Sequence, residues 1–512
     1  MVAMIKKFIT NSFFLSFYTF FAAVLAYFFR LYLAKNLSLA SYGLFYIILD
    51  FFAFISAFND LGFSETQAFF IPKYVVKKRL DKIKAVVKVQ LFNQFCSTFL
   101  ISIIVFFAAD FLAINIFHEP AAALPLKIAL IFFMANDFLM NTKILFYAFQ
   151  EAKFYGSTDL LKFVFSLPLI MILFTFLGKD LNILLYLWGG ITLVIALFFF
   201  FLFLIKHKEV VKAPYYSMVN IYKEFFPYLL PTVLSNNFNI FLTASTNILL
   251  VFFQGLEVVA LYNIAQPIAN ILLIFLRPIA NLLMPIISQA DETGQEKQLK
   301  SIMGLILNTG VFILLPIPLL LTFYAKESII FLFGSQFIGA TWSLRILSFY
   351  LFFNILQDFL VKVLIGLGLQ KKRLKLLTLA SILNFGFSLL LIPIFGATGA
   401  ILANSLSVMI FILGSLNLIK EKIKFHLPIK NYIKMLILIF VFILLNLFLK
   451  KFSAVDLKVQ FILFSLKASF TVICYYLLGI FVLQIINLQL VLNLIKTHYD
   501  HHHPLRRQRH QT

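Results

Sequence analysis

Charged residues and cysteine are both scarce in this chain of 512 residues. Asp, Glu, Lys and Arg together make up 12% of the sequence, whereas 62% of it is hydrophobic, and this balance excludes a water-soluble domain. The two cysteines, Cys96 and Cys474, lie in separate apolar runs and provide neither a disulfide framework nor a metal-binding spacing. The chain also lacks a Gly-rich nucleotide loop, an H-E-x-x-H motif and a Cys/His cluster. We therefore expect no enzyme activity, no ATP-driven pump, no cofactor and no bound metal.

Long hydrophilic segments are missing as well. No connection between the apolar runs is long enough to fold into a soluble catalytic unit. The runs are about 20 residues long and lack the alternation of barrel strands, which is typical of membrane-spanning helices. The first run, 8–30, is too long for the apolar core of a cleavable signal and has no small-residue cleavage site. The sequence thus predicts an all-α polytopic membrane protein that contacts a lipid bilayer.

About fourteen transmembrane helices are expected. Their predicted ranges are 8–30, 42–62, 87–109, 126–148, 158–177, 182–205, 226–253, 258–287, 302–324, 339–365, 376–394, 398–419, 432–449 and 459–485. Lys and Arg collect in alternate connections, most densely in 72–88, which we expect to be a loop. The positive-inside rule places these connections and both termini in the cytoplasm of a cell-membrane protein, with a basic tail at 496–512. This topology explains the net charge of +22, so no nucleic acid partner is expected.

One predicted helix carries a row of polar side chains. The range 262–285 is apolar enough to cross a bilayer, yet its polar residues fall within roughly 60° of one another on an α-helix. We name this row the polar seam, and it consists of Asn263, Gln266, Asn270, Arg277 and Asn281. An arginine near mid-bilayer costs at least ~2.5 kcal/mol unless it faces water or a polar partner. We interpret the polar seam as the lining of a cavity between helices; the alternative is helix packing, with the arginine reaching the headgroups.

Three stretches of the chain are similar to one known family. They are 41–68 (SYGLFYIILDFFAFISAFNDLGFSETQA), 260–294 (ALYNIAQPIANILLIFLRPIANLLMPIISQADETG) and 384–405 (NFGFSLLLIPIFGATGAILANS). They resemble the second helix, the eighth helix with its loop, and the turn between the eleventh and twelfth helices of the Wzx-type polysaccharide flippases. These flippases belong to the multidrug/oligosaccharidyl-lipid/polysaccharide (MOP) exporter superfamily. The resemblance implies two six-helix lobes, 1–225 and 226–425, in a V shape around a central cavity, with two added helices in 426–495.

The resemblance also implies a substrate, an oligosaccharide linked to a polyprenyl pyrophosphate. Its polar, anionic head must cross ~30 Å of hydrocarbon. Arg277 is the leading candidate for the phosphates, because a guanidinium pairs bidentately with phosphate oxygens. Further cations, and amides suited to sugar hydroxyls, complete the expected site: Arg30, Lys143, Arg345, Asn239 and Asn247. For Arg30 and Lys143 the alternative is snorkelling to the interface, and for the amides it is interhelical packing.

Four acids lie within or at the ends of predicted spans, namely Asp50, Asp60, Asp137 and Asp358. A buried carboxylate can bind Na⁺ or exchange a proton, so these acids are candidates for coupling export to an H⁺ or Na⁺ gradient. For Asp60 we favour a fixed structural role in its Asp-Leu-Gly turn. Asp358 lies four residues before Lys362, so the two side chains are expected to pair on one helix face.

Several functions compete with one another. We expect a flippase that binds the head at the cytoplasmic face and releases it outside by rocking its lobes. Two alternatives from the same superfamily are a MATE-type drug/cation antiporter, whose cavity should be dominated by acids, and a lipid II flippase. A membrane glycosyltransferase would need a large outer loop with catalytic acids, and a structural scaffold would leave the polar seam unexplained. The resemblance further suggests a monomer, with glycan polymerase machinery as a candidate partner.

Overall fold

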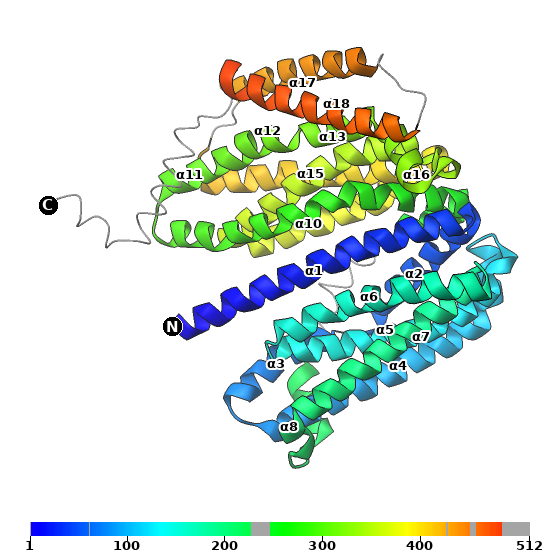
Figure 1. Ribbon diagram of the computed structural model, residues 1–512. Helices are drawn as coiled ribbons and strands as arrows, with labels where there is room; N and C mark the ends of the chain where they lie inside the picture. Colours follow the sequence, from blue (N-terminus) through cyan, green and yellow to red (C-terminus); the bar gives the residue numbers. More distant parts are fainter. Residues whose placement is uncertain (1, 61, 227–245, 426–428, 451–456, 484–512) are drawn as a thin grey trace.

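The computed structural model describes residues 2–60, 62–226, 246–425, 429–450 and 457–483. These residues form helices and contain no β-strand. The first bundle comprises α1 (Val2–Asn36), α2 (Leu39–Asn59), α3 (Phe63–Val76), α4 (Leu80–Asn115), α5 (Ala123–Ala148), α6 (Ala152–Leu177), α7 (Leu181–Lys206) and α8 (Lys208–Lys212). The second comprises α10 (Leu256–Glu292), α11 (Glu296–Gly304), α12 (Val311–Leu314), α13 (Pro316–Phe323), α14 (Ala325–Phe333), α15 (Ala340–Gly366) and α16 (Gln370–Lys422). A last pair, α17 (Ile429–Lys450) and α18 (Leu457–Leu477), packs at the side of the second bundle (Figure 1).

The prediction of a polytopic all-α membrane protein is confirmed. Ten helical stretches among the described residues are long and apolar enough to cross a membrane. One of them, α16, holds two of the predicted spans, joined at Gly396, whose φ of 57° breaks the helix where a turn was expected. The predicted span 226–253 lies largely outside the described residues.

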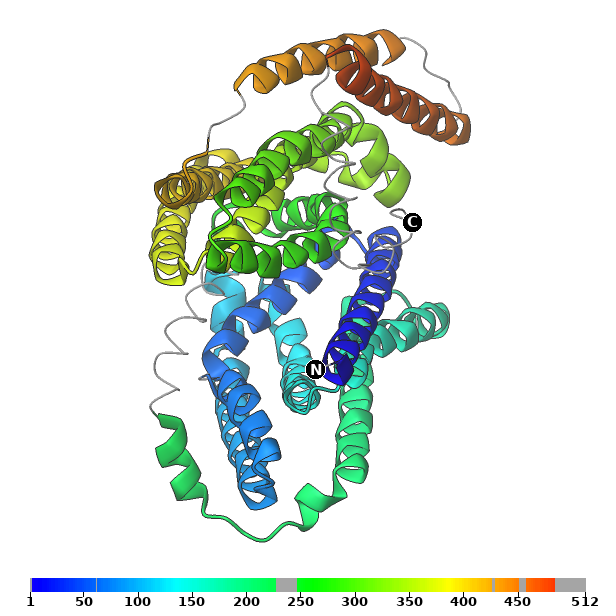
Figure 2. The same ribbon diagram turned by 90° about the vertical axis from the view of Figure 1, so that its left-hand side faces the viewer.

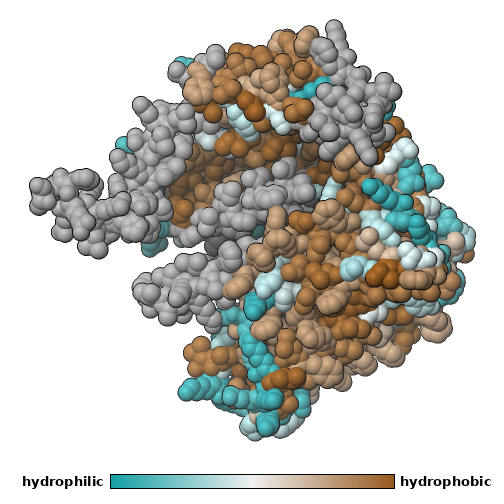
Figure 3. All heavy atoms as spheres, viewed as in Figure 1, coloured by the Kyte–Doolittle hydropathy of each residue, from teal (hydrophilic) through white to brown (hydrophobic). Residues whose placement is uncertain are grey.

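Exposed aromatic and aliphatic side chains cover the helices (Figure 3). Phe107 and Phe176 are 79% and 80% exposed, and comparable apolar residues surround them along α4 and α6. Soluble proteins rarely present apolar surface on this scale, so these faces are lipid-facing. Hydrophilic side chains gather toward the ends of the helices in the same view.

One predicted loop is wrong, and one predicted helix is irregular. The basic stretch 72–88 is not a loop, because α3 continues to Val76 and α4 already begins at Leu80. The segment after Leu80 contains no Gly or Pro, so nothing in it prevents the long α4 from extending beyond the bilayer. The predicted helix 302–324 corresponds to one apolar helical stretch, Glu296–Phe323, which contains α11, a π-helical segment (Leu305–Gly310), α12 and α13. Gly304, Gly310 and Pro316 stand at these junctions, and both residue types weaken a regular helix.

The two bundles meet at one end. Figure 1 shows them close together where α1 ends and where α2 and α10 begin, and farther apart at the end that carries the N-terminus; Figure 2 shows the same bundles from the side. A glycine permits this contact, since a Cβ atom on Gly43 would lie 2.3 Å from the carbonyl oxygen of Leu256. Nearby, the fully buried Tyr42 meets the ring of Phe337 at 5.5 Å between centroids, and Gln336 donates to the carbonyl of Ala34. We name this the inter-bundle contact.

Candidate functional site: polar groups between and within the bundles

A half-buried arginine of the first bundle reaches the second. Arg30, on α1, donates from Nη1 to the carbonyl oxygen of Asn263 on α10, at 3.3 Å. Its guanidinium also lies 4.4 Å from the ring centre of Tyr46 on α2. Arginine tolerates such a site because its planar charge is weakly hydrated and stacks on aromatic rings. Arg30 therefore ties α1 and α2 to α10 near the inter-bundle contact.

An acid on α2 makes the second link. Asp50 accepts a hydrogen bond of 2.5 Å from Nδ2 of Asn247, which precedes α10 in the second bundle. Asp50 also interacts electrostatically with Arg30, so the two opposite charges partly balance each other. Both groups were predicted separately, as a phosphate ligand and as an ion-coupling acid. The structure brings them into one cluster, which can hold the two bundles together and can release them if either charge finds another partner.

The polar seam lies on α10, as predicted, but its side chains are only partly described. Asn263 is 2% exposed, and its Nδ2 has no hydrogen-bond partner in the part of the chain that the structure describes. Gln266 is half-buried one turn further along. The side chains of Asn270, Arg277 and Asn281 lie outside the described residues, as does Asn239 altogether. Their assignment to the cavity stays a prediction.

The other two predicted cations have local neighbours. Lys143, on α5, forms an ion pair with Asp159 of α6 and lies 4.9 Å from the ring centre of Tyr155. The charge of Lys143 is therefore balanced inside the first bundle, which weakens it as a candidate for the phosphates. Arg345 lies near the start of α15, with its guanidinium 4.7 Å from the ring centre of Trp342. The structure does not bring Lys143 and Arg345 together with Arg30.

The remaining predicted acids occupy different settings. Asp60 ends α2 and accepts a 3.1 Å hydrogen bond from the backbone nitrogen of Ser64 in α3, as a residue with a structural role in the turn would. Asp137 is buried in the middle of α5 among neutral polar side chains. Asp358 is half-buried on α15, and its pairing with Lys362 stays a prediction.

Sequence reasoning missed a buried lysine. Lys162, on α6, is 8% exposed, and its ammonium lies 4.4 Å from the ring centre of Trp188 and 4.9 Å from that of Phe132. An ammonium over two aromatic faces is stabilised by their quadrupoles. The sequence feature that could have identified it is that Lys162 is a lone lysine inside the apolar run that starts at 158, three residues after Asp159.

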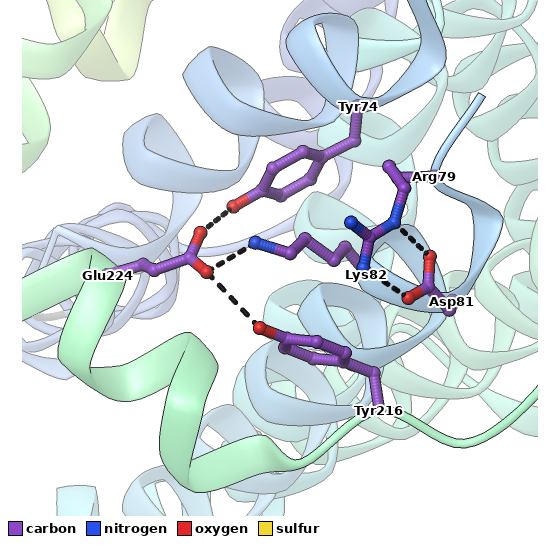
Figure 4. Close-up of polar contacts among 6 residues, drawn as sticks. All are labelled: Tyr74, Arg79, Asp81, Lys82, Tyr216 and Glu224. Carbon is purple, nitrogen blue, oxygen red and sulfur yellow. Dashed lines mark hydrogen bonds and ion pairs between the residues drawn. The ribbon is translucent and has the colours of Figure 1, made fainter. Parts of the chain in front are cut away.

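A polar cluster at the separated end of the bundles holds the segment 213–226, which leads from the first bundle to the second, against α3 and α4 (Figure 4). Glu224 accepts hydrogen bonds from Tyr74, Lys82 and Tyr216, and beside it Arg79 forms a bidentate pair with Asp81 at 2.7 and 3.0 Å. Burial would raise the pKa of Glu224, but the hydrogen bonds from Lys82 and Tyr74 outweigh it and hold the pKa below its ordinary 4.5. Part of the predicted basic stretch is therefore neutralised, and it holds the segment 213–226 against α3 and α4.

Comparisons with known proteins agree with this architecture. The model of a family described as polysaccharide biosynthesis protein matches residues 8–291. An uncharacterized membrane protein of Methanocaldococcus jannaschii, MJ1068, is 26% identical over 490 residues, covering 93% of this chain and 95% of its own length.

Two solved structures share the fold. The lipid II flippase MurJ in an inward closed conformation has a TM-score of 0.65 at 18% identity, covering 90% of this chain and 98% of its own. An inward-facing multidrug resistance MATE family transporter of the MOP superfamily has a TM-score of 0.64 at 16% identity, covering 78% and 94%. At these identities the likeness establishes the fold and leaves the substrate open.

Proposed function

This chain belongs to the polysaccharide biosynthesis protein family, and from that premise we propose that it carries lipid-linked oligosaccharide across the cell membrane by alternating access. The observation that carries the proposal is the inter-bundle contact with its adjoining charges. The bundles are joined at one end through Arg30, Asp50 and their partners on the second bundle, and they lie farther apart at the other end. In the proposed mechanism this charged, hydrogen-bonded junction alternates between a joined and a released state, as rocking of the two bundles requires.

The proposed substrate fits the charges available. Its pyrophosphate is anionic, and in the described membrane-spanning part the candidate cation nearest the junction is Arg30. Arg277 lies on the same helix as Asn263, which accepts from Arg30, about four turns further along and so roughly 20 Å toward the separated end. We propose that Arg277 receives the pyrophosphate first and that the amides of the polar seam hold sugar hydroxyls. Release of the junction would then open the path to the other face.

The topology belongs to the same proposal. Both termini and the Glu224 cluster would be cytoplasmic, because the basic residues around 72–88 accumulate at that end. The joined end would then face outward, and the described conformation would receive substrate from the cytoplasm. We propose a monomer that delivers its substrate to glycan polymerase machinery.

The test uses cells that lack this protein. Lipid-linked oligosaccharide on the cytoplasmic leaflet is quantified, and the cells are then supplied with wild type, Arg277→Glu or Lys179→Glu at matched expression. Lys179 lies in an exposed turn between α6 and α7, so its charge reversal is the matched control. We expect the glycan to accumulate without the protein, and wild type and Lys179→Glu to clear it while Arg277→Glu does not.

Other outcomes discriminate the alternatives. Accumulation of lipid II in place of the oligosaccharide would favour a peptidoglycan flippase. Unchanged lipid-linked pools together with new sensitivity to cationic drugs would favour a drug antiporter. If Arg277→Glu clears the glycan as well as wild type does, the transport function stands and the role of Arg277 is wrong.

A further inference from the structure

A second buried acid of the first bundle has no part in the inter-bundle contact. Asp137 is 5% exposed in the middle of α5, where α2 and α4 pack against it. Its carboxylate accepts hydrogen bonds from Ser56 of α2 at 3.1 Å, and from Thr98 and Gln94 of α4 at 3.0 and 3.3 Å. Asn59 of α2 donates a further one through Nδ2. All four donors are neutral, so they solvate the carboxylate without balancing its charge.

Nearby charged groups do not balance it either. Among the described residues none forms an ion pair with Asp137. The other charged side chains that the structure describes on the surrounding helices and that are not exposed all have partners of their own. On α2, Asp50 accepts from Asn247 and Asp60 from Ser64. On α4, Asp81 pairs with Arg79, Lys82 pairs with Glu224, and Lys84 donates to the carbonyl of Ala213. On α5 and α6, Lys127 pairs with Asp110, Lys143 pairs with Asp159, and Lys162 lies over Trp188. A carboxylate in a membrane-spanning bundle without a counter-charge is costly, and such groups mark functional sites.

The cluster also has more acceptors than donors. Asn59 is 2% exposed, and its Nδ2 donates hydrogen bonds to Asp137 and Thr98. Its Oδ1, by contrast, has no hydrogen-bond partner among the described residues. A buried oxygen without a donor destabilises the folded protein, because the hydrogen bond it made with water is not replaced. An uncompensated carboxylate beside an unsatisfied amide oxygen and two hydroxyl oxygens therefore forms a set of oxygen ligands that lacks a positive charge.

We propose that the Asp137 cluster binds one monovalent cation, either Na⁺ or a proton. Both occupants supply the single positive charge that the site lacks. For Na⁺ the ligands would be the Asp137 carboxylate, Asn59 Oδ1 and the hydroxyls of Ser56 and Thr98, since hard cations prefer oxygen donors. A single carboxylate matches a monovalent ion better than a divalent one. A proton would instead convert the carboxylate into a donor.

The position of the site suggests what its occupancy does. Ser56 and Asn59 lie on the same helix as Asp50, six and nine residues further on, so roughly 9 and 13 Å separate them along α2. A cation that draws Ser56 and Asn59 toward Asp137 would thereby act on the helix that carries the inter-bundle contact. This coupling rests on the transport function proposed above, whereas the binding of the cation does not.

Two measurements on the purified full-length protein test the binding. The first is equilibrium binding of ²²Na⁺ in sodium-free choline buffer. The second is infrared difference spectroscopy of the protonated carboxyl band as the pH is raised. The variants are Asp137→Asn, Thr98→Val, which keeps the shape but removes a ligand, and the control Asp110→Asn. Asp110 pairs with Lys127 at the exposed end of α4. Size-exclusion chromatography establishes that each variant is folded.

Binding of ²²Na⁺ that weakens by about 10- to 100-fold in Thr98→Val, disappears in Asp137→Asn and persists in Asp110→Asn supports a Na⁺ site. If ²²Na⁺ does not bind, a carboxyl band missing only from Asp137→Asn supports the proton. Absence of both signals in wild type, or ²²Na⁺ binding that survives Asp137→Asn, overturns the proposal. Because neither readout involves glycan, wild type that clears glycan without either signal would refute the cation site and leave the transport function standing.

Discussion

Adding one methyl group at Gly43 should push the joined ends of the bundles apart. The added Cβ atom would lie 2.3 Å from the carbonyl oxygen of Leu256, whereas ordinary contacts are about 3.5 Å. The obstacle is backbone, so α2 and α10 must separate by about 1 Å for Gly43→Ala to fit. Overpacking of this kind costs about 1–3 kcal/mol. Since the cost falls on the joined state alone, the ratio of released to joined molecules should rise by about 5- to 150-fold.

The assay is a distance measurement between the bundles. Spin labels are placed at Asp180, at the start of α7, and at Ser335, beside the inter-bundle contact, both of which are exposed. Cys96 and Cys474 are first replaced by serine so that only the introduced cysteines react. Pulsed electron–electron double resonance should show that a longer distance between the two labels, minor in the parent protein, is strongly populated in Gly43→Ala.

The matched control is Gly190→Ala, on α7. A Cβ atom there meets nothing within 4 Å, so the distance distribution should equal that of the parent protein. An unchanged distribution in folded Gly43→Ala, or the same shift in Gly190→Ala, would refute the reasoning.

Three further predictions follow from the polar clusters. Asn247→Leu leaves the Asp50 carboxylate without its amide donor, so the joined state should weaken by about 1–3 kcal/mol, and the same spin-label distance would lengthen; no change would contradict the link. Lys143→Met and Asp159→Asn should each lower the thermal unfolding temperature in detergent, and the double variant should recover part of the loss; strictly additive losses would argue against coupling. Glu224→Gln should speed proteolysis within 213–226. In wild type the same loosening should appear only as the pH falls through the lowered pKa of Glu224, below 4.5, because protonation removes the charge that Lys82 binds; cleavage that does not depend on pH would contradict this.

The overall architecture could be predicted because its signals are local. Apolar runs of bilayer length fix the helices, and Gly396 stands in the turn expected between the helices of α16. The predicted helix boundaries are wrong where a helix extends beyond the membrane. Beyond the bilayer the apolar signal ends although the helix does not. The sequence therefore predicts a loop over 72–88, whereas only residues 77–79 connect α3 and α4.

The site was harder to predict, because its contacts join residues far apart in the sequence. Arg30 and Asn263 are separated by 233 positions and Asp50 and Asn247 by 197, and no spacing rule relates them. The residue types could be selected, since a charged group inside a span is rare. Which cation meets which acid depends on how the bundles pack. That is why the sequence predicts Lys143 as a cation of the substrate cavity and Asp50 as an ion-coupling acid but predicts neither the pairing of Lys143 with Asp159 nor the contact of Asp50 with the second bundle.

The most direct test of the central claim is to lock the inter-bundle contact during transport. Ala34 and Gln336, whose backbone oxygen and side-chain nitrogen lie 2.7 Å apart, are both changed to cysteine in the background without Cys96 and Cys474. A short, reducible bifunctional thiol reagent then joins the bundles in cells whose leaflet distribution of lipid-linked oligosaccharide is followed. Alternating access predicts that cross-linking stops clearance from the cytoplasmic leaflet and that reduction restores it, while each single cysteine has no effect. Clearance that continues at full rate in quantitatively cross-linked protein would contradict the account.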